Sequence, residues 1–193
     1  DFWQQYQTYD VTEALQAGGN AIGFMLGDGW FKGRFGFDGG YEDLYGDQFR
    51  LIAECIVTYE DGTEEIIASD DTWEVAEGPL VSSSIYDGEV YDANLEIDGW
   101  NKYSESESAI CWERMQLSDT DTEELQARLS VPVKIVDAFV PELIITPAGE
   151  QVLDFKQNMT GWITFSADVP DGTVITYEVG EVLQEDNFYR DNL

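Results

Sequence analysis

Apolar and polar residues alternate along much of the chain, and this pattern predicts β-strands. Apolar side chains recur at every second position from Leu51 to Tyr59, and the segment 65–68 that follows is apolar after Glu65. Period-two spacing places these side chains on one face of a strand, and the intervening Asp61-Gly62 favours a two-residue hairpin turn. The same pattern recurs from Thr164 to Tyr177 around Asp171-Gly172. We therefore predict two antiparallel hairpins, at 51–68 and 164–177.

Shorter patterns add further elements. Strands are expected at 20–26, 80–84, 133–139 and 151–155. Two brief helices are expected as well. Asp10 is a candidate N-cap with Glu13 as its reciprocal partner, before Gly18 ends the turn, and Thr120 with Glu123 repeats the pattern up to Leu129.

Many short strands separated by turn residues indicate an all-β fold built from antiparallel sheets. We expect a jelly-roll-like antiparallel β-sandwich over residues 1–130, followed by part of a second β-sandwich over 131–193. The boundary is placed there because 98–130 is polar, acidic and poor in strand pattern, whereas strand pattern resumes downstream.

Composition excludes several classes of partner. The chain has 193 residues, of which 43% are hydrophobic, enough for a folded core. Forty Asp and Glu against nine Lys and Arg give a formal net charge of −31. This charge repels phosphate backbones and anionic lipids, so we expect neither a nucleic acid nor a membrane as partner.

Histidine is absent, which excludes a Ser-His-Asp triad and the commonest zinc ligand. Cys55 and Cys111 are too few for a disulfide scaffold, and we interpret both as core residues. The chain starts at Asp1 with no signal peptide and resembles a trimmed piece of a longer protein. A cytoplasmic and a secreted location both stay open.

A glycine- and aromatic-rich stretch at 26–37 is the first candidate for binding chemistry. It contains Asp28, Trp30 and Arg34 among four glycines and four aromatic residues. A sugar stacks its C–H face on an aromatic ring and needs fixed polar partners for its hydroxyls. The alternative is a glycine-rich strand exit whose rings fill a β core.

An acidic segment at 83–93 is the second candidate. Tyr86, Asp87, Glu89 and Asp92 lie close together around Gly88, and these acids suit a cluster of sugar hydroxyls or a hard cation. Asp87 and Asp92 are the candidate ligands of a calcium ion, and no other cofactor is required. The alternative is an acidic turn on a solvated edge. Asp47, beside an aromatic residue, is a further candidate sugar contact.

Five separated motifs carry a family resemblance when they are taken in order. They are residues 6–12, 26–34, 45–47, 85–93 and 154–162. Together they resemble the non-catalytic N-terminal β domains of bacterial α-L-rhamnosidases.

The resemblance implies a modular, inverting glycoside hydrolase that removes terminal α-L-rhamnose from plant glycosides or polysaccharides. The first domain would resemble a carbohydrate-binding module, and 131–193 would begin a concanavalin-like domain. The catalytic (α/α)₆ barrel would follow in the same polypeptide, so no catalytic residue is assigned here and we expect this chain by itself to be inactive. One departure is Lys156, where family members commonly carry glycine.

Three functions compete. The chain recognises a rhamnose-containing carbohydrate, or it is a purely structural support for the barrel, or it is itself an enzyme acting through two carboxylates. The third is the weakest, because excess acids make chance carboxylate pairs inevitable. Trp30 separates the first two: an exposed hollow shared with Arg34 and the acids favours recognition, and a buried Trp30 favours support.

Overall fold

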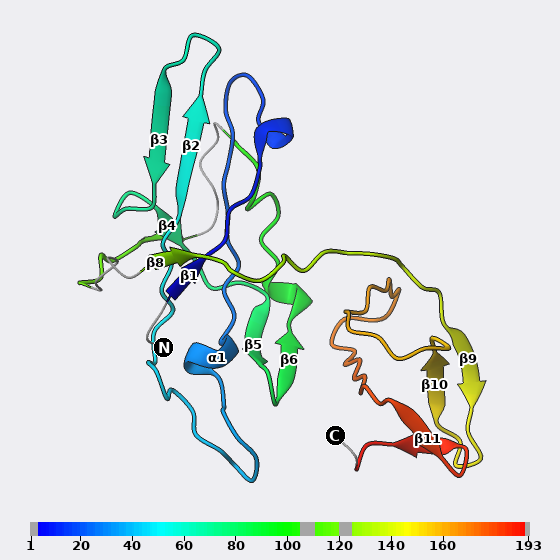
Figure 1. Ribbon diagram of the computed structural model, residues 1–193. Coiled ribbons are helices and arrows are strands. Elements are labelled where there is room, and N and C mark those ends of the chain that lie inside the picture. The colour runs from blue at the N-terminus through cyan, green and yellow to red at the C-terminus, as the bar shows by residue number, and fades with distance from the viewer. Residues whose placement is uncertain (1–3, 105–110, 120–124, 192–193) are drawn as a thin grey trace. The chain divides into compact units, whose positions relative to one another are not determined.

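The computed structural model describes residues 4–104, 111–119 and 125–191. The chain divides into two compact units, Asp1–Leu129 and Ser130–Leu193 (Figure 1). Each unit is described by itself.

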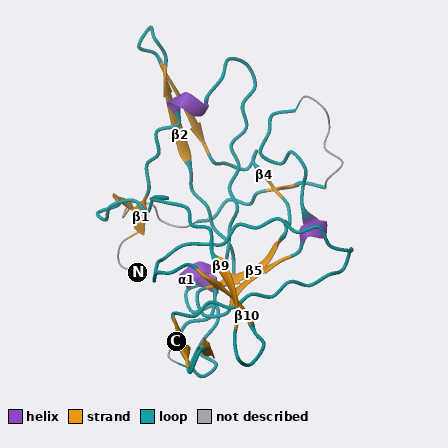
Figure 2. Ribbon diagram, turned by 90° about the vertical axis from the view of Figure 1, so that its right-hand side faces the viewer, coloured by secondary structure: helices purple, strands orange, loops and turns teal. Residues whose placement is uncertain are grey.

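Short strands joined by long loops make up both units (Figure 2). Five pairs of strands are antiparallel and β1 with β8 is parallel. The all-β class with antiparallel pairing is therefore confirmed. In chain order the strands are β1 (Gln4–Tyr6), β2 (Glu54–Thr58), β3 (Glu64–Ala68), β4 (Glu74–Val75), β5 (Leu80–Ser84), β6 (Gly88–Tyr91), β7 (Glu113–Arg114), β8 (Leu125–Ala127), β9 (Glu142–Ile145), β10 (Gln151–Asp154), β11 (Val182–Gln184) and β12 (Asn187–Tyr189).

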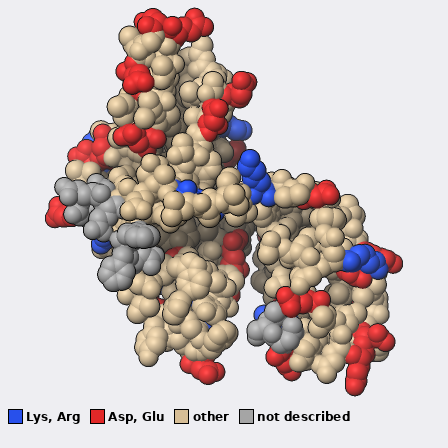
Figure 3. Space-filling model, in the orientation of Figure 1, with Lys and Arg blue, Asp and Glu red and all other residues tan. Residues whose placement is uncertain are grey.

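The β2–β3 hairpin confirms the first predicted pair but corrects its turn. Tyr59 N–H donates to the Thr63 carbonyl at 2.9 Å, and Gly62 N–H donates to the Tyr59 carbonyl at 2.9 Å. Gly62 has φ +82°. The connection is thus a three-residue loop ending in a left-handed residue, rather than a two-residue Asp61-Gly62 turn. Acidic side chains gather at this tip (Figure 3).

The β5–β6 hairpin and one short helix frame the region of interest in the first unit. The predicted strand at 80–84 is confirmed as β5, which pairs with β6 from Leu80↔Tyr91 to Ser84↔Gly88. Helix α1 (Gly29–Lys32) was not predicted, since the pattern there indicated a strand exit. It packs on β5 through buried Gly33, where a Cβ would lie 3.3 Å from the Ser84 Cβ and 2.6 Å from the Gly29 carbonyl.

Both predicted helices are wrong in extent or type. The first is a single 3₁₀ turn, η1 (Thr12–Ala14), because Leu15 returns to extended backbone, although Asp10 does accept the Thr12 N–H at 3.0 Å. The second covers β8, whose pairing with β1 overrides its helical spacing. Residues 120–124 lie outside the described residues.

Two predicted strands and one predicted hairpin do not form. Residues 20–26 and 133–139 have no ladder partner, and the 164–177 segment keeps only its turn, where Thr173 N–H donates to the Pro170 carbonyl at 3.1 Å. Alternation makes a segment compatible with a strand, but a strand also needs a hydrogen-bonding neighbour. The predicted strand at 151–155 is confirmed as β10.

In the second unit, Glu150 ties its two hairpins together. The Glu150 carboxylate accepts a hydrogen bond from the Thr146 hydroxyl at 2.9 Å in the β9–β10 hairpin. The same oxygen accepts the backbone N–H of Phe188, in β12, at 2.9 Å. Asn187 adds a bond from the Ala148 N–H at 2.9 Å.

Apolar side chains of the described residues are half-buried or exposed throughout, and none is fully buried. Cys55 is half-buried and Cys111 is exposed, so the interpretation of both as core residues is wrong for Cys111, and neither is in a disulfide. Within the described residues, no helix has the length and apolar character needed to cross a lipid bilayer.

Candidate functional site

An ion pair joins the two motifs that the sequence singled out. Arg34, just after α1, donates from Nε to both Asp87 oxygens at 2.9 and 3.0 Å, and from Nη2 to Oδ1 at 2.8 Å. Asp87 lies in the β5–β6 turn and also accepts the Ser84 hydroxyl at 3.2 Å. The Arg34 Nη1 donates to the Gly36 carbonyl. These bonds fix the guanidinium in one orientation.

Four aromatic rings surround this ion pair. Tyr86 is at the centre: Phe37 meets it edge-on at 5.4 Å, Trp30 at 6.2 Å and Phe35 at 6.4 Å between ring centroids. Trp30 and Phe35 contact each other at 5.2 Å. The Arg34 Cζ lies 5.1 Å from the Tyr86 centroid, a cation–π distance. We name Trp30, Arg34, Phe35, Phe37, Tyr86 and Asp87 the Arg34–Tyr86 cluster.

The rings of the cluster are accessible. Trp30 is 52% exposed and Phe37 is 75% exposed, whereas Tyr86 is half-buried beneath them. Flat apolar faces beside a fixed cation and carboxylate are what a sugar ring needs from a binding surface. The arrangement can therefore stack the C–H face of a small ring and hydrogen-bond its hydroxyls.

Electrostatics keep the ion pair charged. The hydrogen bond from Arg34 is the largest cause that lowers the pKa of Asp87 below its ordinary value. Desolvation opposes it, and the positive charge of Arg34 and the hydrogen bond from Ser84 add smaller lowering effects. The pKa of Arg34 is raised, first by the hydrogen bond to Asp87. Both groups are charged at neutral pH.

Asp28 lies beside the cluster, but its carboxylate is bonded to groups of α1 and β5. Its carboxylate pairs with Lys32 at 3.2 Å within α1 and accepts the Ser83 N–H of β5 at 3.3 Å. Its side chain is only 16% exposed. Asp28 therefore fastens α1 to β5, and its contribution to the site is to position Trp30 and Arg34.

Asp47 and Glu89 are further from the ion pair. Asp47 is exposed in a loop that returns past α1, and its charge acts on Lys32, where it is one of the smaller causes that raise the pKa. Glu89 is exposed in β6 opposite Ser83, and its charge acts on Tyr91. Among the described residues, no hydrogen bond or ion pair joins either carboxylate to Arg34 or Tyr86.

Asp92 is not brought to Asp87. It follows β6, whereas Asp87 precedes it, and the Asp92 carboxylate caps η2 (Ala93–Leu95) by accepting the Asn94 N–H at 3.0 Å. The four residues of β6 lie between them, and five steps of extended chain separate their Cα atoms by about 16 Å. With Asp87 already held by Arg34, this pair does not fit a shared calcium site. No group of three or more metal-ligating side chains occurs among the described residues.

Sequence reasoning did not single out Phe35, Phe37 or Ser84 as site residues. The two phenylalanines were visible in the 26–37 stretch, but ring positions relative to Tyr86 depend on α1, which carries no periodic signal in four residues. Ser84 was within the acidic segment, and its role depends on the short β5–β6 turn.

Two family models match the chain. "Alpha-L-rhamnosidase N-terminal domain" covers residues 1–137, and "Bacterial alpha-L-rhamnosidase concanavalin-like domain" covers 144–193. The chain belongs to the α-L-rhamnosidase family. It contains N-terminal domains of that family, as the five motifs implied.

Curated relatives named α-L-rhamnosidase agree. The protein from Streptomyces avermitilis is 36% identical over 98% of this chain and 18% of its own length. One from Formosa agariphila is 34% identical over 96% of this chain and 20% of its own length. The chain thus spans about a fifth of the length of the relatives it matches.

Solved structures give the same family. The native α-L-rhamnosidase of Aspergillus terreus is similar with a TM-score of 0.71 and 34% identity, over 83% of this chain and 18% of that one. The Streptomyces avermitilis enzyme, solved in complex with L-rhamnose, has a TM-score of 0.55 and 34% identity, over 68% and 12%.

Proposed function

We propose that this chain is an accessory, carbohydrate-recognising region of an α-L-rhamnosidase, and that the Arg34–Tyr86 cluster contacts a rhamnose-containing carbohydrate. The parent enzyme would hydrolyse terminal α-L-rhamnose, with its catalytic domain elsewhere in the same polypeptide. The observation that carries the proposal is the convergence of Trp30, Arg34, Tyr86 and Asp87 from two separate motifs onto one accessible surface.

Each part of the cluster has a distinct role. Trp30 and Phe37 offer exposed faces for the apolar side of a sugar ring. Arg34 is the hydroxyl-binding donor, because its remaining N–H groups are presented in a fixed plane. Asp87, engaged on both oxygens, is a positioning residue for Arg34.

A purely structural role is the second candidate. Its support is that many large apolar side chains of the first unit are exposed, so exposure of Trp30 is not unusual by itself. Such surfaces are suited to contact with another domain. The two candidates differ in whether the Arg34–Tyr86 cluster has affinity for a free sugar.

The domain division that we propose is 1–130 and 131–193. The two compact units, which divide in sequence between Leu129 and Ser130, support it. The two family models also separate two domains, but further along the chain, between residues 137 and 144. The second piece would be an incomplete concanavalin-like domain.

Calorimetric titration of the chain with L-rhamnose, once with added calcium and once with a chelator, tests the proposal. We expect saturable one-site binding that is the same in both conditions, since Asp87 and Asp92 do not meet. Absence of binding in both conditions would favour the structural role. Binding only with calcium would assign the affinity to a site other than this ion pair.

A further inference from the structure

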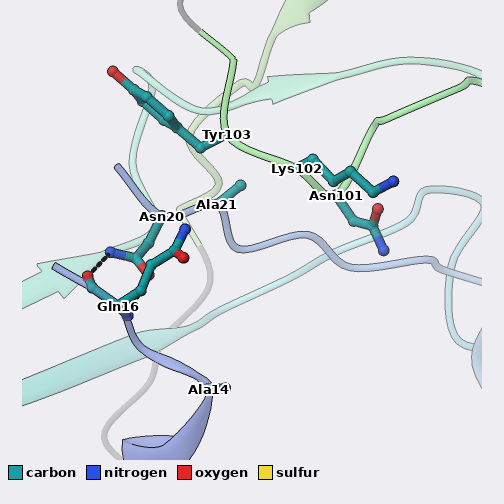
Figure 4. Close-up of a pocket in the computed structure, with 7 residues that line it drawn as sticks. All are labelled: Ala14, Gln16, Asn20, Ala21, Asn101, Lys102 and Tyr103. Atoms are coloured by element: carbon teal, nitrogen blue, oxygen red, sulfur yellow. Dashed lines mark hydrogen bonds between the residues drawn. The ribbon is translucent and has the colours of Figure 1, made fainter. Parts of the chain in front are cut away.

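A second concave surface of the first unit lies outside the Arg34–Tyr86 cluster. Two segments form it, residues 14–21 after η1 and residues 101–103, and it has a volume of about 380 Å³. That volume falls within the range of about 300–1,000 Å³ common for ligand pockets. Its lining residues are Ala14, Gln16, Asn20, Ala21, Asn101, Lys102 and Tyr103 (Figure 4).

One wall of this pocket is held by its own hydrogen bonds. Asn20 accepts the Gln16 N–H at 3.0 Å and donates to the Gln16 carbonyl at 2.8 Å and the Gly18 carbonyl at 3.1 Å. The Gln16 side chain donates to the Gly19 carbonyl at 3.1 Å. The turn therefore keeps its form without a ligand.

The second segment is fitted closely against that wall. The Tyr103 ring lies so near Gly19 that a Cβ there would approach the ring to 2.2 Å. This contact fixes the 101–103 segment beside the 14–21 turn. Figure 4 shows the Asn101 amide and the Lys102 ammonium on the same side of the pocket.

Lys102 is the charged group of this pocket, and its Nζ has no carboxylate within 4.0 Å among the described residues. Four other basic side chains of this acidic chain, Lys32, Arg34, Lys156 and Arg190, do form ion pairs. A lysine that forms no ion pair with the described residues, beside amide groups that both donate and accept, is suited to a ligand that combines hydroxyls with one negative charge.

We infer that the pocket between the 14–21 turn and residues 101–103 binds a sugar residue that carries one anionic group. Lys102 binds the anionic group as a point charge, and the amides of Asn101 and Gln16 hydrogen-bond ring hydroxyls. A carboxylate and a sulfate ester share this chemistry. The inference is independent of rhamnose binding at the Arg34–Tyr86 cluster.

The test is a titration of the 193-residue chain with glucuronate, glucose 6-sulfate, glucose and acetate, followed by NMR of the side-chain amides. The solution is kept at about 0.15 M salt, where the Debye length of about 8 Å screens the net charge of the chain. We expect either acidic sugar to shift the amide signals of Gln16 and Asn101 saturably, with glucose much weaker.

Lys102→Gln should weaken that binding about tenfold, as expected for loss of a hydrogen bond to a charged group. Lys134→Gln changes the net charge equally and lies in the other unit, so it is the matched control. The relative affinity for glucuronate and for glucose 6-sulfate shows whether the pocket prefers a carboxylate or a sulfate ester.

Three results would overturn the inference. One is equal binding of glucose, which would remove the charge requirement. Another is equal binding of acetate, which would indicate an adventitious ion only. The third is an equal effect of Lys102→Gln and Lys134→Gln. Because Trp30 and Arg34 are unchanged in these variants, L-rhamnose binding should be unaffected, and failure here is distinguishable from failure of the proposed function.

Discussion

At the residue scale, Lys156 has a backbone conformation that favours glycine. It has φ +65°, in the left-handed region, at the position where the resembled family commonly carries glycine. Its ammonium pairs with Glu142 at 2.8 Å and Asp154 at 3.0 Å, and Asp154 also accepts the Lys156 N–H at 2.7 Å. The sequence indicated that a lysine replaces the usual glycine here. The structure shows that this lysine has left-handed backbone, which is strained, and that its ammonium forms two ion pairs.

Comparing Lys156→Gly with Lys156→Ala separates the contribution of backbone strain to stability from that of the ion pairs. Both remove the exposed pairs, which contribute little, but only alanine retains the left-handed strain. We expect Lys156→Gly to be more stable to urea than Lys156→Ala by about 1 kcal/mol. Equal stability of the two variants would show that the position carries no strain.

Sugar affinity should depend on pH through Asp87. Its pKa is lowered by Arg34, so the ion pair is intact above the ordinary value of 3.8 and is lost as the pH falls through the lower folded value. L-Rhamnose affinity should therefore be flat near neutrality and fall only in acid. Asp87→Asn should bind more weakly at neutral pH and lose this acid-dependent decrease, whereas Asp61→Asn, in the distant hairpin loop, should keep it.

At the scale of elements, local turn chemistry was predictable and pairing was not. The β2–β3 hairpin and strand β10 were predicted from their patterns, and Asp61-Gly62 marked the place of the β2–β3 loop although not its length. Helix α1 is too short to show a period. Strand β8 has helical spacing, but it pairs with β1, whose residues lie 121 positions earlier in the chain. Both the α1–β5 contact and the Arg34–Asp87 ion pair depend on such long-range placement.

Gly33→Ala tests whether the seating of α1 on β5 builds the site. A Cβ at Gly33 would lie 2.6 Å from the Gly29 carbonyl, so α1 must shift and Trp30 and Arg34 must move with it. We expect at least a fivefold loss of L-rhamnose affinity by calorimetry. Gly78→Ala is the control, because a Cβ there meets nothing within 4 Å. Equal affinity of both variants would disconnect α1 from binding.

At the scale of the whole molecule, the family and the all-β class could be predicted, because five motifs keep their order over most of the chain. The extent of the exposed apolar surface could not be predicted from the sequence. Alternation shows which side chains share a face of a strand, but not whether another element covers that face. The relatives are about five times longer than this chain. This is consistent with the proposal that the chain is an accessory region of a longer enzyme.

We therefore expect no hydrolysis of aryl α-L-rhamnosides by this chain. The measurement is release of the chromogenic aryl alcohol over a prolonged incubation, with a full-length α-L-rhamnosidase as positive control. Turnover that a single carboxylate substitution in this chain abolishes would contradict the assignment of the chain as non-catalytic.

The most direct test of the central claim compares sugar binding and unfolding in Trp30→Ala. Trp30 is 52% exposed. Its removal should therefore lower the free energy of unfolding by far less than the loss of about 3–5 kcal/mol that is typical for a buried tryptophan. We predict a loss of L-rhamnose affinity of tenfold or more with a nearly unchanged melting temperature, while Trp162→Ala, 70% exposed in the other unit, changes neither. Unchanged affinity in Trp30→Ala, or affinity and stability lost together, would contradict recognition at the Arg34–Tyr86 cluster.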